Sequence, residues 1–581
     1  MVFLRGVSGV LYQQMAAVVT YSLLASLAVA LTLIPVLSSR FHRVRRPGAG
    51  GPMQRLGGLA GRAFDRMDDA YGRLLRRALR QRTLVIVAAA ALFALSVVLV
   101  RGIGVELMPA ADEGEVQVNL EMAVGTRLEL SEAAAKNVEA IVRREVPEAT
   151  LILTEVGGGG FGTGGTHTAQ VRVMLAPRKD RTRSSFQVAD DLRPKVSGLP
   201  GVTARTRSGQ GLFILRLGAA TADSISVEVR GYDLAAARDL ARSVEAAVKR
   251  VDGVTDARVS RDEGSPEQVI RLDRLRAADQ GVSVTRVGEA LETAVGGTLA
   301  GNFRDRGKEY PIRVRLAERE RRDLDDLLDL TVAGDRGGQV ALRNVVDAEP
   351  RLGPVRIERK DQERIIFVNA NYTGRDLGSV VADIRRELQA VTVPPDFSVA
   401  FGGDWEEQQK AFRELLIGFA LAVFLVYMVM AGQFESYRDP FIVLFSIPMA
   451  LIGITATMLA TRTIFSIQAF IGCIMLAGIV VNNAILLVDY TNLLRRRDGL
   501  PLAEAVTLAG SRRLRPILMT TLTTVLGLLP LSFGLGEGGE AQAPMARVVI
   551  GGLTSSTLIT LVLVPVVYSV FAGGRAGGGE R

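Results

Sequence analysis

The chain has 581 residues, of which 48% are hydrophobic, and it carries a formal net charge of +9. This length exceeds that of a single soluble domain and indicates several units. The single cysteine, Cys473, excludes a disulfide framework, and the two histidines, His42 and His167, are too far apart for a histidine-rich metal site. Because no nucleophile–base pair, paired carboxylates or metal-spaced cluster occurs, we expect neither enzymatic activity nor a bound cofactor or metal.

Seven apolar runs have the length of about 20 residues that a membrane-spanning helix needs. They are Met15–Leu37, Thr83–Val100, Phe412–Met430, Phe441–Leu459, Ile467–Val488, Ile517–Phe533 and Val548–Val570. Arginines gather in the loops after the first and the fifth runs, which the positive-inside rule assigns to the cytoplasm. The positive charge is therefore explained by membrane topology and does not indicate nucleic-acid binding. Residues 102–409 are predicted to be exported.

Two segments connect the first two runs. Pro47–Gly61 is rich in proline and glycine and is predicted to be a connector, and Ala63–Arg82 has apolar residues at helical spacing with arginines on the other face. This amphipathic helix has two possible placements. It lies on the inner membrane surface with its arginines against anionic headgroups, or it packs on protein.

The exported segment alternates strands and helices. Strands are predicted at 116–122, 150–156, 168–175, 225–229, 256–260, 365–372 and 398–401, and helices at 127–146, 234–251 and 376–391. This order is typical of split βαβ units of the ferredoxin-like kind, and the irregular segment between them is predicted to be an inserted subdomain. The expected fold class is an α-helical transmembrane bundle joined to an α+β exported domain.

The stretch Gly157–Gly165 contains seven glycines in nine positions. A phosphate-binding loop is excluded because no Gly-Lys-Ser/Thr follows, a strand rather than a helix comes next, and the segment is exported. A hinge loop is the better interpretation, since glycine tolerates positive φ angles.

The stretch Gly478–Tyr490 places two adjacent amides, Asn482 and Asn483, in an apolar helix. At about 100° per residue, Asn482 and Asp489 lie on nearly the same face as Gly478. Polar groups within the membrane need partners inside the protein, so this face is predicted to point into a helix bundle and to be functional. The alternative is that the two amides only hold helices together.

Five stretches, in this order, resemble the resistance-nodulation-division (RND) exporters, specifically the hydrophobe/amphiphile efflux pumps of Gram-negative bacteria. They are Glu106–Gly114, Gly432–Pro440, Gly478–Tyr490, Arg513–Thr520 and Gly551–Leu553. The resemblance covers essentially the whole chain and implies the second half of a twelve-span pump, preceded by the last span of the first half. Met1 is accordingly interpreted as a truncation or an internal start.

The resemblance implies a homotrimer in the inner membrane that exports small amphiphilic molecules by proton antiport. A periplasmic adaptor protein and an outer-membrane channel would complete the conduit, and membrane lipids would surround it. The implied divisions are the last span of the first half (1–37), a cytoplasmic linker (38–82), a span (83–101), porter subdomains (102–265 and 365–407), a docking subdomain (266–364), a five-span bundle (408–572) and a cytoplasmic tail (573–581).

The resemblance also implies site residues. Asn482 occupies a position where well-known members have lysine, and Arg513 and Thr520 match the proton relay, whose carboxylates belong to a span upstream of Met1. Asp489 is the one carboxylate well inside a span. The glycine-rich stretch matches the switch loop, with Phe161 at its tip and the implied site glycines Gly157, Gly160, Gly162 and Gly165. Two pocket positions that are phenylalanine in multidrug members are Thr154 and Arg172, which weakens the case for flat lipophilic drugs.

Two alternatives stay open. A heavy-metal exporter of the same superfamily would need soft thioether ligands in the porter cleft, for which Met122 and Met174 are available. A standalone membrane-anchored periplasmic module would fit a chain that lacks the first half. The sequence leaves the substrate, the adaptor and the channel undetermined.

Overall fold

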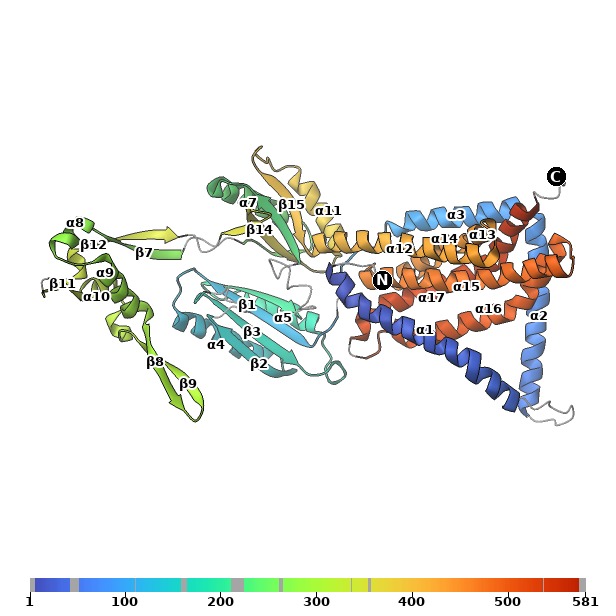
Figure 1. Ribbon diagram of the computed structural model, residues 1–581, viewed down its shortest axis with the longest axis horizontal. Coiled ribbons are helices and arrows are strands. Elements are labelled where there is room, and N and C mark those ends of the chain that lie inside the picture. The colour runs from blue at the N-terminus through green and yellow to red at the C-terminus, as the bar shows by residue number, and fades with distance from the viewer. Residues whose placement is uncertain are drawn as a thin grey trace.

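The computed structural model of the chain describes residues 6–41, 52–109, 111–157, 165–209, 224–260, 265–335, 337–353, 357–536 and 538–573. Figure 1 shows two parts, a bundle of long helices and an α+β part that extends from one end of it. Seven helical segments within the described residues are long and apolar enough to cross a membrane, and they coincide with the seven predicted runs. The predicted fold class is confirmed.

The bundle is built from long helices that follow the apolar runs. They are α1 (Gly6–Phe41), α3 (Arg82–Val100), α12 (Asp404–Phe434), α13 (Arg438–Leu444) with α14 (Ser446–Ala460), α15 (Ile467–Arg497), α16 (Leu502–Ser532) and α17 (Gly539–Gly573). Helix α17 packs against α14, α15 and α16 and is the centre of the bundle. Helix α1 stands apart, because the whole of its apolar segment is exposed.

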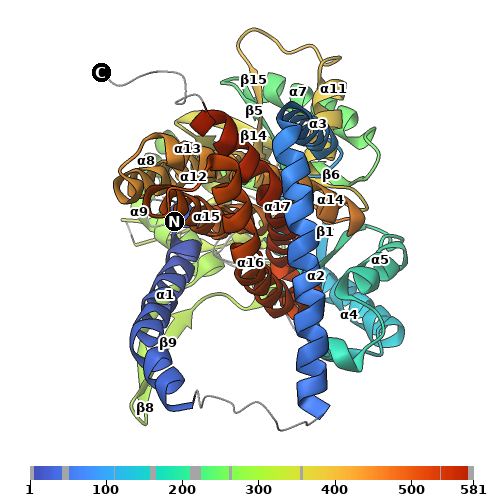
Figure 2. The same cartoon turned by 90° about the vertical axis from the view of Figure 1, so that its right-hand side faces the viewer.

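Helix α2 (Pro52–Arg80) runs across the end of the bundle, roughly perpendicular to the spanning helices (Figures 1 and 2). It begins within the predicted connector, because proline is well tolerated at the first helical position and does not stop a helix there. Its apolar face packs on the bundle: Leu75 is fully buried, and the Tyr71 hydroxyl donates to the Leu561 carbonyl over 2.7 Å. Of the two placements open from the sequence, the structure therefore has the packed one.

The first sheet has the ferredoxin-like strand order β2-β3-β1-β4, with every pair antiparallel. Its elements are β1 (Glu115–Met122), α4 (Leu128–Glu145), β2 (Ala149–Val156), β3 (Thr168–Leu175), α5 (Ser185–Val196) and β4 (Val202–Ser208). Val118, Val138 and Val171 form part of a core between the sheet and its two helices. The sequence reasoning missed α5 and β4, which complete the β-α-β-β-α-β unit.

The second sheet repeats this unit around an insertion. Strands β6, β14, β5 and β15 lie side by side in the ferredoxin-like order, and β13 extends the sheet beside β14. The elements are β5 (Ile225–Arg230), α7 (Leu234–Lys249), β6 (Val254–Val259), β13 (Glu358–Lys360), β14 (Glu363–Tyr372), α11 (Leu377–Leu388) and β15 (Ser398–Gly403). The chain leaves this unit after β6 and returns at β13.

The inserted segment forms its own small core at the far end of the molecule from the bundle (Figure 1). It contains β7 (Ser265–Leu272), α8 (Arg274–Asp279), α9 (Val284–Leu291), β8 (Thr298–Asp305), β9 (Lys308–Val314), α10 (Leu324–Leu328), β10 (Thr331–Ala333), β11 (Gln339–Ala341) and β12 (Val346–Gly353). The hairpin β8–β9 protrudes, and every one of its strand residues is exposed. The porter and docking names for these parts stay predictions.

The arrangement predicts the side of the membrane on which each loop lies. A reporter enzyme fused after Gly334, in the inserted segment, is expected to be exported, and one fused after Gly499, between α15 and α16, is expected to stay cytoplasmic. Alkaline phosphatase and green fluorescent protein, which are active on opposite sides, measure both fusions. An active cytoplasmic reporter at Gly334 would contradict the architecture.

Candidate functional site

The two adjacent amides singled out in the sequence lie on α15, where they face in different directions. Asn483 is buried at 6% exposure, whereas Asn482 is exposed together with Gly478, Asp489 and Leu493. These four exposed residues share one face of the helix, which we call the open stripe of α15. The face was predicted to point into a bundle, but in the described chain α14, α16 and α17 pack on the other sides and leave it uncovered.

The two other predicted relay residues lie on α16. The Arg513 guanidinium stacks on the Tyr490 ring with 4.9 Å between its central carbon and the ring centroid, and its Nε is buried without a hydrogen-bond partner. Thr520 is exposed, and its hydroxyl donates to the Ile517 carbonyl of its own helix over 2.9 Å. Among the described residues no hydrogen bond joins Asn482, Arg513 and Thr520 to one another, so the relay stays a prediction.

A polar network that the sequence reasoning missed joins α13, α15 and α17. Asn492 Nδ2 donates to the buried carboxylate of Asp439 over 2.9 Å, and the Tyr568 hydroxyl donates to Asn492 Oδ1 over 2.6 Å. Arg495 in turn donates to the Tyr568 oxygen over 3.1 Å. Buried polar groups that satisfy one another fix the relative placement of the elements that carry them. The signal was present, because Asp439 belongs to the matching stretch Gly432–Pro440.

The two predicted pocket residues of the exported part lie on opposite faces of the first sheet. Thr154 opposes Val171 across the β2–β3 pair and donates to Glu139 of α4 over 2.5 Å, on the side that the helices cover. Arg172 opposes Leu153 and donates from Nε to Gln170 Oε1 over 3.1 Å, on the side without helices. The structure does not bring the two together, and their role in binding stays a prediction.

The helix-free face of the first sheet carries a hydrogen-bonded network. Gln170 Nε2 donates to Asn119 Oδ1 over 2.8 Å, and Arg207 donates to Gln117 Oε1 over 2.6 Å. Glu121 pairs with Arg205 of β4 over 2.8 Å and with Arg258 of β6 over 3.6 Å. The pair with Arg258 joins the two ferredoxin-like units. The helix-free face is thus polar along its length, a feature readable in the alternating polar residues of β1.

The two candidate thioether ligands do not converge. Met122 is buried on the helix side of β1, as are Val116 and Val118. Met174 of β3 is 40% exposed and lies opposite Glu115, which is at the other end of β1 from Met122. At 3.3 Å per residue, seven residues along β1 separate the two ends by roughly 23 Å. These methionines cannot bind one metal ion together.

Only the two ends of the predicted switch loop can be placed, since Gly160, Phe161 and Gly162 lie outside the described residues. Gly157 has φ +72°, and a Cβ there would lie 2.6 Å from Leu128 Cδ1. A Cβ on Gly165 would lie 2.6 Å from the His167 ring. Gly157 favours glycine because of its positive φ, whereas the atoms that a Cβ would meet at both ends belong to side chains; the gating role of the loop stays a prediction.

Glu106, the first residue of the first matching stretch, connects the exported part to the bundle through hydrogen bonds. The backbone N–H of Glu106 donates to the Phe465 carbonyl over 3.0 Å, and the Tyr372 hydroxyl donates to Glu106 Oε1 over the same distance. Burial raises the pKa of Glu106 above its ordinary value, the Tyr372 hydrogen bond lowers it, and the negative charges of Asp376 and Asp404 raise it further. The net shift is upward, so Glu106 holds its proton more tightly in the folded chain than in the unfolded chain.

The raised pKa of Glu106 predicts a pH dependence of stability. Its favourable contribution is fully present below the unfolded pKa and is lost as the pH rises through the raised folded pKa. Glu106→Gln keeps an acceptor for Tyr372 without the charge, so it is expected to unfold at a higher temperature than the parent at about pH 8, with the difference vanishing near about pH 4. Thermal unfolding in detergent measures it. Glu363→Gln, at an exposed position, is the control, and an equal pH-dependent difference for both would contradict burial as the cause.

Comparison with known proteins decides the family. Residues 1–572 match the sequence profile of the AcrB/AcrD/AcrF family. The chain belongs to this family. The membership agrees with the expectation of a multi-pass RND transporter with periplasmic α+β domains rather than an enzyme.

Individual relatives refine the comparison. The cobalt-zinc-cadmium resistance protein CzcA of Cupriavidus metallidurans is 28% identical over 97% of this chain and 53% of its own length. HelA of Legionella pneumophila is 29% identical over 100% of this chain and 55% of its own length. The multidrug resistance protein MdtC of Yersinia enterocolitica is 26% identical over 98% of this chain and 55% of its own length.

A crystal structure of a heavy metal efflux pump superposes with a TM-score of 0.76 at 27% identity, covering 88% of this chain and 52% of that one. The chain therefore spans about half the length of the relatives that it matches.

Proposed function

We propose that this chain is one half of an RND transporter that exports divalent transition-metal ions from the cell. The observation that carries the proposal is the superposition on a heavy metal efflux pump over 88% of the chain, at a TM-score of 0.76. The names of CzcA and of the nickel and cobalt resistance protein CnrA, which is 27% identical over 99% of the chain, support the same substrate class. Transport driven by protons remains part of the proposal by family likeness.

The placement of the two candidate thioether ligands argues against soft monovalent ions as the substrate. Thioether sets select Cu(I), and Met122 and Met174 lie on opposite faces of the sheet. The helix-free face presents amide oxygens instead, and its carboxylate Glu121 is paired with Arg205 and Arg258. Since the described residues contain no group of three or more His, Cys, Asp and Glu placed to hold a metal, we propose that ions pass through weak, partly hydrated contacts.

Assembly is proposed from the exposed surfaces. The hairpin β8–β9 exposes Leu299, Phe303 and Ile312 at 47% or more, and such protruding apolar residues need cover. We propose that the hairpin joins copies of the chain, in agreement with the homotrimer that the sequence implied. A periplasmic adaptor and an outer-membrane channel complete the proposal by family likeness.

The test measures growth of a host that lacks its own metal exporters. The chain is co-produced with the first half of a metal-exporting relative, and inhibitory concentrations are measured for zinc, cobalt, cadmium, nickel and copper salts and for a panel of amphiphilic dyes. We expect tolerance to rise several-fold for the divalent ions and to stay unchanged for the dyes. Tolerance to the dyes without tolerance to the metals would instead support the amphiphile export implied by the sequence and by MdtC. Metal tolerance conferred by the chain when it is produced without a first half would support a standalone module.

A further inference from the structure

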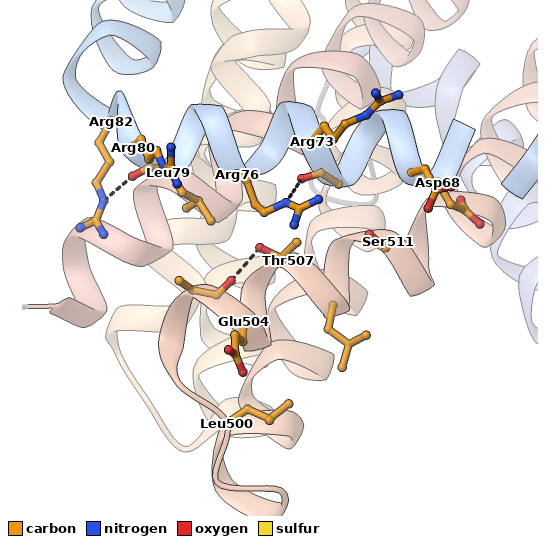
Figure 3. Close-up of a pocket in the computed structure, with 14 residues that line it drawn as sticks. Asp68, Arg73, Arg76, Leu79, Arg80, Arg82, Leu500, Glu504, Thr507 and Ser511 are labelled. Atoms are coloured by element: carbon orange, nitrogen blue, oxygen red, sulfur yellow. Dashed lines mark hydrogen bonds between the residues drawn. The ribbon is translucent and has the colours of Figure 1, made fainter. Parts of the chain in front are cut away.

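A groove separates α2 from the first half of α16 at the end of the bundle that the arginine-rich loops assign to the cytoplasm. Its volume is about 1080 Å³ (Figure 3). Four arginines line it from α2 and from the start of α3: Arg73, Arg76, Arg80 and Arg82. The opposite wall is the first three turns of α16, including the hydroxyls of Thr507 and Ser511. None of the transport features described above uses this groove.

The arginines of the groove outnumber the carboxylates that line it. Arg73, Arg76 and Arg80 follow helical spacing and form one stripe along α2. Arg76 Nε donates to the Gly72 carbonyl over 3.3 Å, and Arg82 Nε donates to the Leu79 carbonyl over 3.0 Å. In the described part of the chain no ion pair links any of the four to a carboxylate. Like charges held this close repel one another unless an anion lies between them.

Three acidic residues also line the groove, one fewer than the arginines. Asp68 Oδ2 accepts from Arg515 Nε of α16 over 2.9 Å, whereas Asp68 Oδ1 is buried without a hydrogen-bond partner. Glu504 lies in the first turn of α16, where the helix dipole stabilises a negative charge. Asp69 is exposed at the edge. The net surplus in the groove is therefore positive.

The surroundings place this positive surplus beside hydrocarbon. Burial of Leu75 and the hydrogen bond from Tyr71 to Leu561 fix α2 on the bundle, so the arginine stripe has a defined position. Helix α3 begins next to the groove and exposes Leu84 at 64% and Val87 at 61%. Apolar side chains of a spanning helix that are this exposed face lipid tails. A ligand with an anionic head and apolar tails matches both surfaces at once.

We propose that the groove between α2 and α16 binds the phosphate of an anionic phospholipid, with the acyl chains along α3. Arg76 and Arg82 donate to the phosphate oxygens, as Figure 3 shows both guanidinium groups on the α16 side of α2. Arg73 and Arg80 add to the local positive potential. The lipid phosphate would hold α2 against the bundle because it binds Arg76 of α2 and Arg82 of α3 at the same time.

The test measures binding of fluorescently labelled phosphatidylglycerol to the purified 581-residue chain in neutral detergent micelles, by anisotropy. Arg76→Gln with Arg82→Gln removes the two phosphate donors and is expected to weaken binding by about 30-fold, taking about 1 kcal/mol for each arginine near a membrane surface. The lysine pair Arg76→Lys with Arg82→Lys keeps the charge and is expected to retain most of the affinity, which separates lost binding from lost folding.

A matched control removes the same charge elsewhere on the helix. Arg66→Gln with Arg77→Gln changes two exposed arginines of α2 that do not line the groove, and binding is expected to stay as in the parent. Equal weakening by both glutamine pairs would overturn the proposal, because it would show attraction to a basic surface without a site. Full displacement of the lipid by millimolar inorganic phosphate would also overturn it, since the ligand would then be a soluble phosphate. Displacement by unlabelled phosphatidylglycerol but not by phosphatidylcholine is the supporting result.

Discussion

Replacing Gly551 with valine is expected to prevent the membrane bundle from folding. A Cβ at this position would lie 2.1 Å from Thr457 Oγ1 and 2.6 Å from the Gly453 carbonyl oxygen of α14. The threonine side chain can rotate, but the backbone oxygen cannot move without separating α14 from α17. Small residues at such crossings let two helix backbones approach closely, and that packing is what holds membrane helices together.

The expected size of the effect follows from the number of contacts that would be lost. Overpacking a well-packed core costs about 1–3 kcal/mol for added methyl groups, and a forced separation of two helices costs more. Helix α17 is also the element on which α15 and α16 pack, so the disturbance spreads through the bundle. We expect Gly551→Val to give little monodisperse protein in detergent and Gly551→Ala to give protein with a lowered unfolding temperature.

Gly527→Val is the matched control for this prediction. Gly527 lies in α16, also within a spanning helix, and a Cβ there would meet nothing within 4 Å. Fluorescence-detected size-exclusion chromatography measures yield and dispersity for both variants at equal expression. If Gly551→Val and Gly527→Val give the same profile as the parent, the close crossing of α14 and α17 is not what holds the bundle.

The sequence predicted the spans and most of the exported elements because their signals are local. Hydrocarbon forces each spanning segment to be apolar for its full length, and half-buried strands alternate. Helix α5 and strand β4 were missed for physical reasons. Pro194 lies inside α5, and β4 has the sequence Val-Thr-Ala-Arg-Thr-Arg-Ser, whose outward side is fully polar. Only pairing with β1 reveals it as a strand.

The candidate site could be predicted only in part, because the face on which a side chain lies depends on how its strand or helix packs against others. Thr154 and Arg172 were assigned to one pocket, but the antiparallel register places Thr154 opposite Val171 and so on the helix side. Likewise Asn482 and Asn483 are adjacent in sequence, and only the packing of α14, α16 and α17 decides that one is buried and the other open. The network of Asp439, Asn492 and Tyr568 joins residues from three helices, and only Asp439 lies in a stretch that the sequence singled out.

Asn482→Leu is expected to abolish metal tolerance when the chain is co-produced with a first half. The open stripe of α15 exposes Asn482 and Asp489 at membrane-helix positions, and polar groups exposed to hydrocarbon cost free energy unless other helices satisfy them. Under the proposed function, these other helices come from the first half, together with the carboxylates that take up protons. The chain alone is then expected to give no tolerance, and the leucine would remove the polar contact on which coupling depends.

The same substitution should act in the opposite direction on the isolated chain. Leucine in place of an amide exposed to lipid or detergent is favourable by transfer, so Asn482→Leu is expected to leave the unfolding temperature of the chain alone unchanged or raised. Thr523→Leu is the matched control, because Thr523 is an exposed hydroxyl on α16 outside the predicted relay. It should keep metal tolerance in the co-produced pump. Tolerance that persists in Asn482→Leu at equal membrane levels would mean that the open stripe only packs against its neighbours. Tolerance conferred by the chain alone would show that no first half is needed.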